Sequence, residues 1–162
     1  MRLVLDAVRD ILLFIEQNQE AEYDYNGVFD IKPLSAKYII EELGDGKYYT
    51  KEEVGYAINL LFNEGIISGN PCTGKNNRII NLRITGISFK GHKLLDNIRS
   101  NTVWDKVKER AASLGVKGLD GLCEISKNTI EKIIEDSEII PNLLRELRWF
   151  YFCINSQHYD DK

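Results

Sequence analysis

The chain has 162 residues and a mass of 18.6 kDa, which fits one domain with a small appendage. Hydrophobic residues make up 43% of the sequence, charged residues 28%, and the formal net charge is -4, so intrinsic disorder is excluded. The low proline and glycine content and the lack of a sustained heptad repeat exclude collagen-like and coiled-coil classes, and a pI near 5.3 argues against a strongly basic nucleic-acid binder.

The cysteines and the apolar segments indicate where the protein acts and whether it binds a metal, a cofactor or a membrane. The three cysteines are far apart and form no CxxC pair: Cys72, Cys123 and Cys153. We expect free thiols in a reducing cytoplasm, no metal site and no cofactor. The early acidic residues predict that no signal peptide is present. The longest apolar run, residues 149–154, is too short to span a membrane, so we expect no membrane partner.

The first predicted helix covers residues 1–19. Its apolar residues recur at i, i+3, i+4 and i+7, which places them on one helical face: Leu5, Val8, Ile11, Leu12 and Ile15. A polar segment follows. Phe29 and Ile31 then alternate with polar residues, which predicts a short strand ahead of Pro33.

Two further helices are predicted from their capping residues. Ser35 is expected to cap a helix over Ala36–Leu43. Thr50 and Glu53 have the spacing of a capping box, which predicts a helix running to about Asn63.

Two β-branched segments, residues 66–68 and 79–84, predict a hairpin with a polar loop over residues 69–78. Three helices followed by a two-stranded wing is the element order of a winged helix-turn-helix. The fold class predicted is therefore mainly α with a small β-hairpin (α+β), built as a winged helix-turn-helix core with a C-terminal helical extension.

The extension begins after the fourth helix. Capping residues predict helices over residues 89–99 behind Ser88 and 103–114 behind Thr102, and apolar spacing predicts a helix over 119–135. These elements suggest three segments, in chain order: a core over residues 1–100, a helical extension over 101–155 that packs on the core or lies in a dimer interface, and a disordered tail over 156–162.

Three sequence stretches resemble a known family. Residues 6–12 read Asp-Ala-Val-Arg-Asp-Ile-Leu, residues 53–61 read Glu-Val-Gly-Tyr-Ala-Ile-Asn-Leu-Leu, and residues 87–92 read Ile-Ser-Phe-Lys-Gly-His. They resemble domain-of-unknown-function family 2513 of bacteria and prophages, over roughly residues 1–134. The family often has Tyr-His where this chain has Tyr56-Ala57, so a role for that histidine does not transfer. The resemblance implies a winged-helix-like core, a link with phages or mobile elements, and no known activity.

The Gly91-His92 pair has an enzymatic and a structural interpretation. His92 and Asp96 are four residues apart on one helix, where they can pair, and Trp104 of the next helix can cover them. A catalytic histidine needs a nucleophile, a metal or an acid partner, and the sequence has no catalytic motif. We therefore favour a packing and capping motif and predict that the chain is not an enzyme.

The candidate nucleic-acid-binding residues lie on the second and third helices. We select Lys37, Tyr56 and Asn59, because asparagine can read adenine and lysine and tyrosine can contact phosphate. Glu52 and Glu53 would repel a DNA backbone. The alternative is that this surface binds protein, or nothing.

The predicted wing adds a basic segment. Residues 66–100 contain six basic residues and one acidic residue, whereas residues 1–65 contain six basic and thirteen acidic residues. The loop residues that could reach a groove or a phosphate are Lys75, Asn76, Asn77 and Arg78. The alternative is a solvated hairpin that its lysines keep soluble.

The C-terminal segment is the candidate for partner binding. Residues 143–154 are apolar on nearly every helical face, which is typical of a buried helix or one shared between subunits. The interaction residues predicted are Leu147, Trp149, Phe150 and Tyr151. Core packing and a homodimer interface both remain open.

Two functions follow from the sequence. The first is a phage- or prophage-associated protein that binds double-stranded DNA, as a homo-oligomer. The second is a protein-interaction module that keeps the winged-helix fold without DNA affinity.

Overall fold

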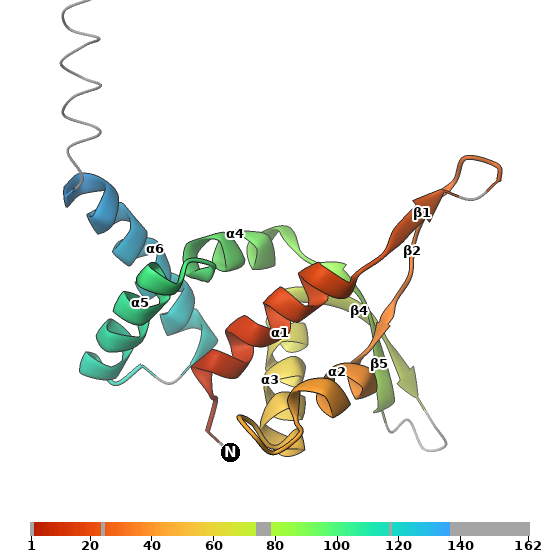
Figure 1. Cartoon of the computed structure of the whole chain (residues 1–162), viewed down its shortest axis with the longest axis horizontal. Coiled ribbons are helices and arrows are strands. Elements are labelled where there is room, and N and C mark those ends of the chain that lie inside the picture. Colours follow the sequence, from red (N-terminus) through yellow and green to blue (C-terminus); the bar gives the residue numbers. More distant parts are fainter. Residues whose placement is uncertain (1, 24, 74–78, 117, 137–162) are drawn as a thin grey trace, which may run out of the picture. The chain divides into compact units, whose positions relative to one another are not determined.

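The computed structural model describes residues 2–23, 25–73, 79–116 and 118–136 (Figure 1). The chain divides into two compact units, Met1–Lys127 and Asn128–Lys162. The helices are α1 Leu5–Asn18, α2 Ala36–Leu43, α3 Lys51–Asn63, α4 Phe89–Ile98, α5 Asn101–Ser113 and α6 Leu119–Asp136. The strands are β1 Ala21–Tyr23, β2 Phe29–Ile31, β3 Leu34–Ser35, β4 Ile67–Thr73 and β5 Ile79–Ile87. The predicted class, mainly α with small antiparallel sheets, is confirmed.

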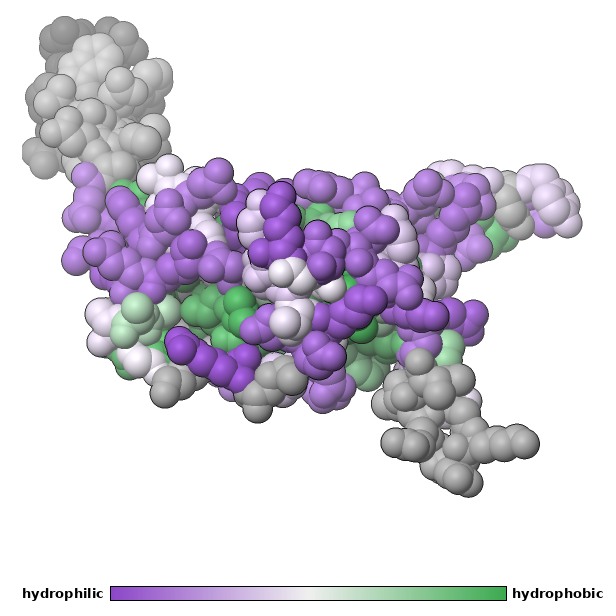
Figure 2. Space-filling model, turned by 60° about the horizontal axis from the view of Figure 1, so that its bottom comes forward, coloured by the Kyte–Doolittle hydropathy of each residue, from purple (hydrophilic) through white to green (hydrophobic). Residues whose placement is uncertain are grey.

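The core of the first unit forms around α1. The face predicted from the apolar spacing is buried, with Val8, Ile11, Leu12 and Ile15 at 0% exposure. Helices α2, α3, α4 and α5 all contribute buried side chains to the same cluster: Ile39, Val54, Ala57, Leu61, Leu94, Leu95, Ile98, Trp104 and Val107. Polar side chains cover most of the face shown in Figure 2, and apolar colour appears there only in patches.

The larger sheet has the strand order β3-β5-β4, and all its pairs are antiparallel. Strand β4 runs through Thr73, so the prediction of a loop starting at Gly69 is wrong. Strand β4 lies at the sheet edge, where Pro71 can be accommodated because its missing N–H need not pair. The register shifts beside Gly69 and Thr73, and these irregularities allow a glycine- and proline-containing segment to continue as a strand.

The smaller sheet is the β1–β2 hairpin, with Tyr23 opposite Phe29. It confirms the short strand predicted at Phe29 and Ile31. The hairpin extends away from the helices (Figure 1).

The N-terminus of α3 carries the predicted capping box. The Glu53 backbone N–H donates to the Thr50 hydroxyl at 3.2 Å, and the Thr50 N–H donates to the Glu53 carboxylate at 2.9 Å. Both bonds satisfy donors that have no partner within the helix. The helix that they start ends at Asn63, as predicted.

The N-terminus of α2 differs from its prediction. Helix α2 has the predicted bounds, but the Ser35 side chain makes no capping bond. Instead, the Asn81 side-chain oxygen accepts from the Lys37 N–H at 3.3 Å, and the Asn81 amide donates to the Ser35 hydroxyl at 3.0 Å. Strand β5 thus supplies the cap, and the Ser35 hydroxyl helps to hold it.

The connection between α4 and α5 also differs from its prediction. Ser88 caps α4 as expected, accepting from the Gly91 N–H at 3.1 Å. Helix α5, however, begins at Asn101 behind Ser100, so Thr102 is not its cap. The reason is that Arg9 of α1 binds the backbone carbonyls at the end of α4, and this allows the chain to turn at once into α5.

An ion pair between Glu16 of α1 and Arg99 gives a first prediction. Arg99 donates to both Glu16 oxygens, one at 2.8 Å, and this hydrogen bond lowers the pKa of Glu16 below its ordinary value. A lowered folded-state pKa stabilises the fold at neutral pH, and the stabilisation disappears as the pH falls through that pKa. Glu16→Gln should lower the unfolding free energy by about 0.5–1 kcal/mol at pH 7, since the pair is partly exposed. The difference should vanish once the pH lies below the lowered pKa of Glu16.

Urea titrations of Glu16→Gln at several pH values measure this effect. Glu109→Gln, at an exposed glutamate of α5, is the matched control and should leave stability unchanged. A stability loss in Glu16→Gln that is the same at every pH would contradict a role for the carboxylate charge.

Candidate nucleic-acid interface

A hollow of ≈ 350 Å³ lies between α2, α3 and β5. Lys37 of α2, Asn59 of α3 and Asn81 of β5 line it together with apolar side chains and Gly55. Two of the three helix residues predicted to bind nucleic acid therefore lie at one site. The third, Tyr56, is half-buried and packs against the core.

Asn81 positions the lysine at this hollow. Since Asn81 caps α2 through the Lys37 N–H, it fixes the first turn of α2 on strand β5. The Lys37 side chain is 76% exposed, and its ammonium lies 3.8 Å from Glu41 in the next turn. A pair that is so long and exposed contributes little, so the ammonium can exchange it for a phosphate oxygen.

Asn59 lies on the exposed side of α3. The neighbouring positions Val54, Ala57, Ile58 and Leu61 are buried, and this fixes the rotation of the helix. The exposed amide of Asn59 offers one donor group and one acceptor, the combination that pairs with the edge of adenine. The structure places Asn59 on the exposed face that the sequence predicts for it.

The β4–β5 hairpin adds a residue that the prediction did not name. Arg83 is exposed on β5, between the buried Leu82 and Ile84, and it lies opposite Ser35 and Asn70 in the sheet register. The alternation of apolar and polar residues around Arg83 could have identified it. The predicted loop residues Lys75, Asn76, Asn77 and Arg78 lie outside the described residues.

The predicted interaction residues Leu147, Trp149, Phe150 and Tyr151 also lie outside the described residues, as does the predicted tail. Residues 101–127, assigned to the extension, belong to the first compact unit. Helix α5 packs on α1 there, through the bonds of Trp104 and Lys108 to Asp6.

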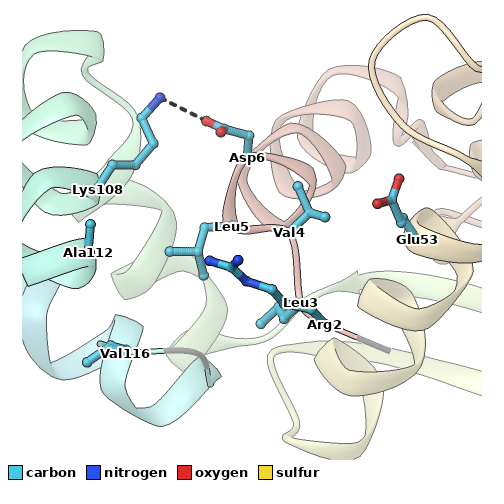
Figure 3. Close-up of a pocket in the computed structure, with 9 residues that line it drawn as sticks. All are labelled: Arg2, Leu3, Val4, Leu5, Asp6, Glu53, Lys108, Ala112 and Val116. Carbon is cyan, nitrogen blue, oxygen red and sulfur yellow. Dashed lines mark ion pairs between the residues drawn. The ribbon is translucent and has the colours of Figure 1, made fainter. Parts of the chain in front are cut away.

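A second pocket, of ≈ 510 Å³, contains two carboxylates, Asp6 and Glu53 (Figure 3). Asp6 accepts from the Trp104 indole N–H at 2.7 Å and from the Lys108 ammonium at 3.1 Å. Glu53 belongs to the capping box of α3. Val4 lies between the two carboxylates in Figure 3, and each already has a structural partner. This arrangement is not that of a general acid–base pair.

The Gly91-His92 pair lies at the start of α4. His92 is exposed, and Asp96 pairs with Arg99 at 3.3 Å. Trp104 is buried and donates to Asp6 on α1, so it does not cover a His92–Asp96 pair as predicted. Gly91, in contrast, packs closely on the β4–β5 end of the sheet, near Ile66 and Ile87.

Within residues 2–136, apart from the positions that the structure does not describe, no group of three or more His, Cys, Asp or Glu side chains could hold a metal ion. None of the helices in the described part of the chain is long and apolar enough to cross a membrane.

These features define a small helical protein in which a largely apolar hollow, bordered by a lysine and two asparagines, adjoins an antiparallel hairpin. The chain belongs to the family of hypothetical proteins DUF2513, whose model matches residues 2–117, and this confirms the resemblance seen in the sequence. It is similar to an uncharacterized protein of Haemophilus influenzae, with 27% identity over 131 residues, which cover 80% of this chain and 95% of the relative. No solved structure matches the chain.

Proposed function

We propose that this protein is a non-enzymatic winged helix-turn-helix protein that binds double-stranded DNA through α3 and the β4–β5 hairpin. In this proposal it acts in the bacterial cytoplasm, as a regulator associated with a phage or a mobile element. The observation that carries the proposal is the hollow that Lys37 and Asn59 line together.

The order of the elements supports the fold part of the proposal. Strand β3 precedes α2 and α3, and β4 and β5 follow them, with β5 central in the sheet. In a winged helix-turn-helix, the second helix of the motif reads the major groove, and the hairpin lies beside it. In the proposed fold, α3 would be this second helix.

The charge of α3 sets the kind of DNA binding to expect. Its first turn carries Glu52 and Glu53, which oppose a phosphate backbone. The basic contact at the hollow would therefore come from Lys37 of α2, and Asn59 would provide base readout. Binding of this kind is weak at physiological salt and strengthens as the salt concentration falls.

The test is an anisotropy titration of a labelled DNA duplex, selected from a random pool, over a range of salt concentrations. Lys37→Gln should reduce the slope of log affinity against log salt by about 1, because one phosphate contact is lost. Asn59→Ala should leave the slope unchanged and reduce discrimination at one base pair by about 1–3 kcal/mol. The pair Lys75→Ala and Arg78→Ala tests the loop, and should flatten the slope further.

The control is Lys106→Gln, which removes an exposed lysine of α5 and should leave the titration as in the wild type. If the wild-type protein binds no duplex at low salt, or if Lys106→Gln changes the slope as much as Lys37→Gln, the proposal is wrong.

A second candidate function, protein interaction without DNA affinity, is favoured by the β1–β2 hairpin. Four large apolar side chains are exposed there: Tyr23 at 72%, Tyr25 at 97%, Val28 at 59% and Phe29 at 54%. The acidic residues of the same segment disfavour contact with DNA. Size-exclusion chromatography with light scattering, run beside the titration, distinguishes the two candidate functions. Protein interaction without DNA affinity requires that the protein assembles and that it does not bind the DNA duplex.

A further inference from the structure

A third pocket, of ≈ 490 Å³, opens between α4 and the first part of α6. It shares no lining residue with the hollow between α2, α3 and β5. Helix α4 contributes residues at positions 90, 93, 94 and 97, a spacing that places them along one helical face. Helix α6 contributes Cys123 and Lys127, one turn apart. Three lysines, Lys90, Lys93 and Lys127, thus line a pocket of a size typical for a small ligand.

We propose that this pocket binds a phosphate group of a nucleotide, with Phe89 as the stacking surface for its base. The proposal concerns a site separate from the α3 surface and does not depend on duplex binding there.

Charge is the first argument. The Lys90 ammonium donates to an uncharged group, the backbone carbonyl of Glu64, at 3.3 Å. Across the described residues, no carboxylate lies within ion-pair distance of Lys90 or Lys93. The one carboxylate of the lining, Asp96, is paired with Arg99. Two neighbouring ammonium groups without an ion pair, those of Lys90 and Lys93, favour an anionic ligand.

The other polar groups of the pocket agree with a phosphate. The Asn97 side chain can donate through its amide. Burial raises the pKa of the Cys123 thiol; the Lys90 ammonium lowers it in part, and the carboxylates of Asp120 and Glu64 raise it further. The thiol therefore stays protonated and adds no negative charge. The ammonium groups of Lys90 and Lys93 and the Asn97 amide are hydrogen-bond donors, and a phosphate oxygen is an acceptor.

Phe89 provides the aromatic part of the site. It is the first residue of α4, next in sequence to Lys90, and its side chain is 77% exposed. The Lys93 ammonium lies 4.4 Å from the centre of its ring. This contact joins the exposed ring to one of the pocket lysines. An exposed ring beside a cluster of cations is the combination by which proteins hold an unpaired base and its phosphate.

The experiment uses three probes: inorganic pyrophosphate, the nucleoside monophosphate AMP, and a short oligothymidylate. We expect the double variant Lys90→Gln, Lys93→Gln to bind every probe at least about tenfold more weakly than the wild type. Phe89→Leu should weaken AMP and oligothymidylate by about fivefold or more, and leave pyrophosphate unchanged. The control Lys106→Gln removes the same charge from α5 and should bind as the wild type does.

Cys123 reports occupancy of the pocket directly. In a chain carrying Cys72→Ser and Cys153→Ser, saturating AMP should slow the alkylation of Cys123 at least about threefold, because a ligand in the pocket covers a lining side chain. Tighter binding of oligothymidylate than of AMP assigns the site to a nucleic-acid strand, and equal binding assigns it to a free nucleotide.

Three results would overturn the proposal: no probe binds at low salt, the double lysine variant binds like the wild type, or saturating ligand leaves the alkylation rate unchanged. The duplex-binding proposal is tested independently of this pocket, because Lys37→Gln should weaken duplex binding and leave AMP binding unchanged. Circular dichroism of each variant verifies that the helices are retained.

Discussion

Gly91→Ala should destabilise the protein by about 2–3 kcal/mol, although alanine is the better helix former. A Cβ at Gly91 would lie 2.6 Å from Cγ2 of Ile87 and closer still to the carbonyl oxygen of Ile66. Both atoms belong to the sheet end on which α4 packs, and the carbonyl also accepts from the Ser88 N–H at 2.9 Å. The backbone cannot move away without losing that bond, so the steric cost exceeds the gain in helix propensity. Urea unfolding measures the change.

Gly55→Ala is the matched control for this prediction. Gly55 also lies inside a helix, but a Cβ there would meet only Cδ1 of Ile40, at 3.6 Å, which is ordinary contact. Alanine should therefore stabilise α3 by about 0.5–1 kcal/mol. The same chemical change thus has opposite signs at the two positions. Equal effects at both would mean that α4 does not pack closely on the sheet.

This contrast also explains the Gly91-His92 pair in the third stretch that resembles the family. Glycine is required at position 91 for a steric reason, because no side chain fits between α4 and Ile66. The histidine is exposed, and the carboxylate one turn away pairs with Arg99. The sequence pattern favoured packing over catalysis, but the partners of the motif could not be read from helical spacing alone.

Sequence patterns predicted correctly those elements that depend only on residues close together in the chain. The apolar spacing of α1 and the Thr50–Glu53 capping box depend on residues within a few positions of each other, and both are confirmed. The cap of α2 comes from Asn81, whose side-chain oxygen accepts a hydrogen bond from the Lys37 N–H, 44 residues earlier in the chain. Ser35 has the typical identity of a cap, so the local signal pointed to the wrong residue. Tertiary contacts decided the outcome.

The candidate site shows the same division. Lys37 and Asn59 were selected for their side-chain chemistry, lysine for phosphate and asparagine for adenine. That they border one hollow depends on the packing of α2 and α3 against β5, which no pattern along the chain encodes. The lysine pocket between α4 and α6 was likewise visible in the sequence only as an excess of basic residues.

Arg9→Met should cost about 2–3 kcal/mol of stability, the second large effect that we expect. The Arg9 Nε donates to the carbonyl of Ile98 at 2.8 Å, and Nη2 donates to the carbonyl of Arg99 at 2.7 Å and to the Asn101 side chain at 2.6 Å. These carbonyls end α4 and have no helical partner of their own. One guanidinium on α1 therefore fixes the turn by which the chain passes from α4 to α5.

Arg9→Lys separates the geometry of this contact from its charge. A lysine keeps the charge but lacks the fork of donors that reaches several acceptors at once, so it should recover less than half of the loss. Amide exchange locates the effect: in Arg9→Met the first amides of α5, up to Trp104, should exchange at least about tenfold faster, because the turn that orders them is released. Lys106→Met, at an exposed position of α5, should change neither stability nor exchange. If Arg9→Lys is as stable as the wild type, charge alone holds the turn, and the guanidinium bonds add nothing to it.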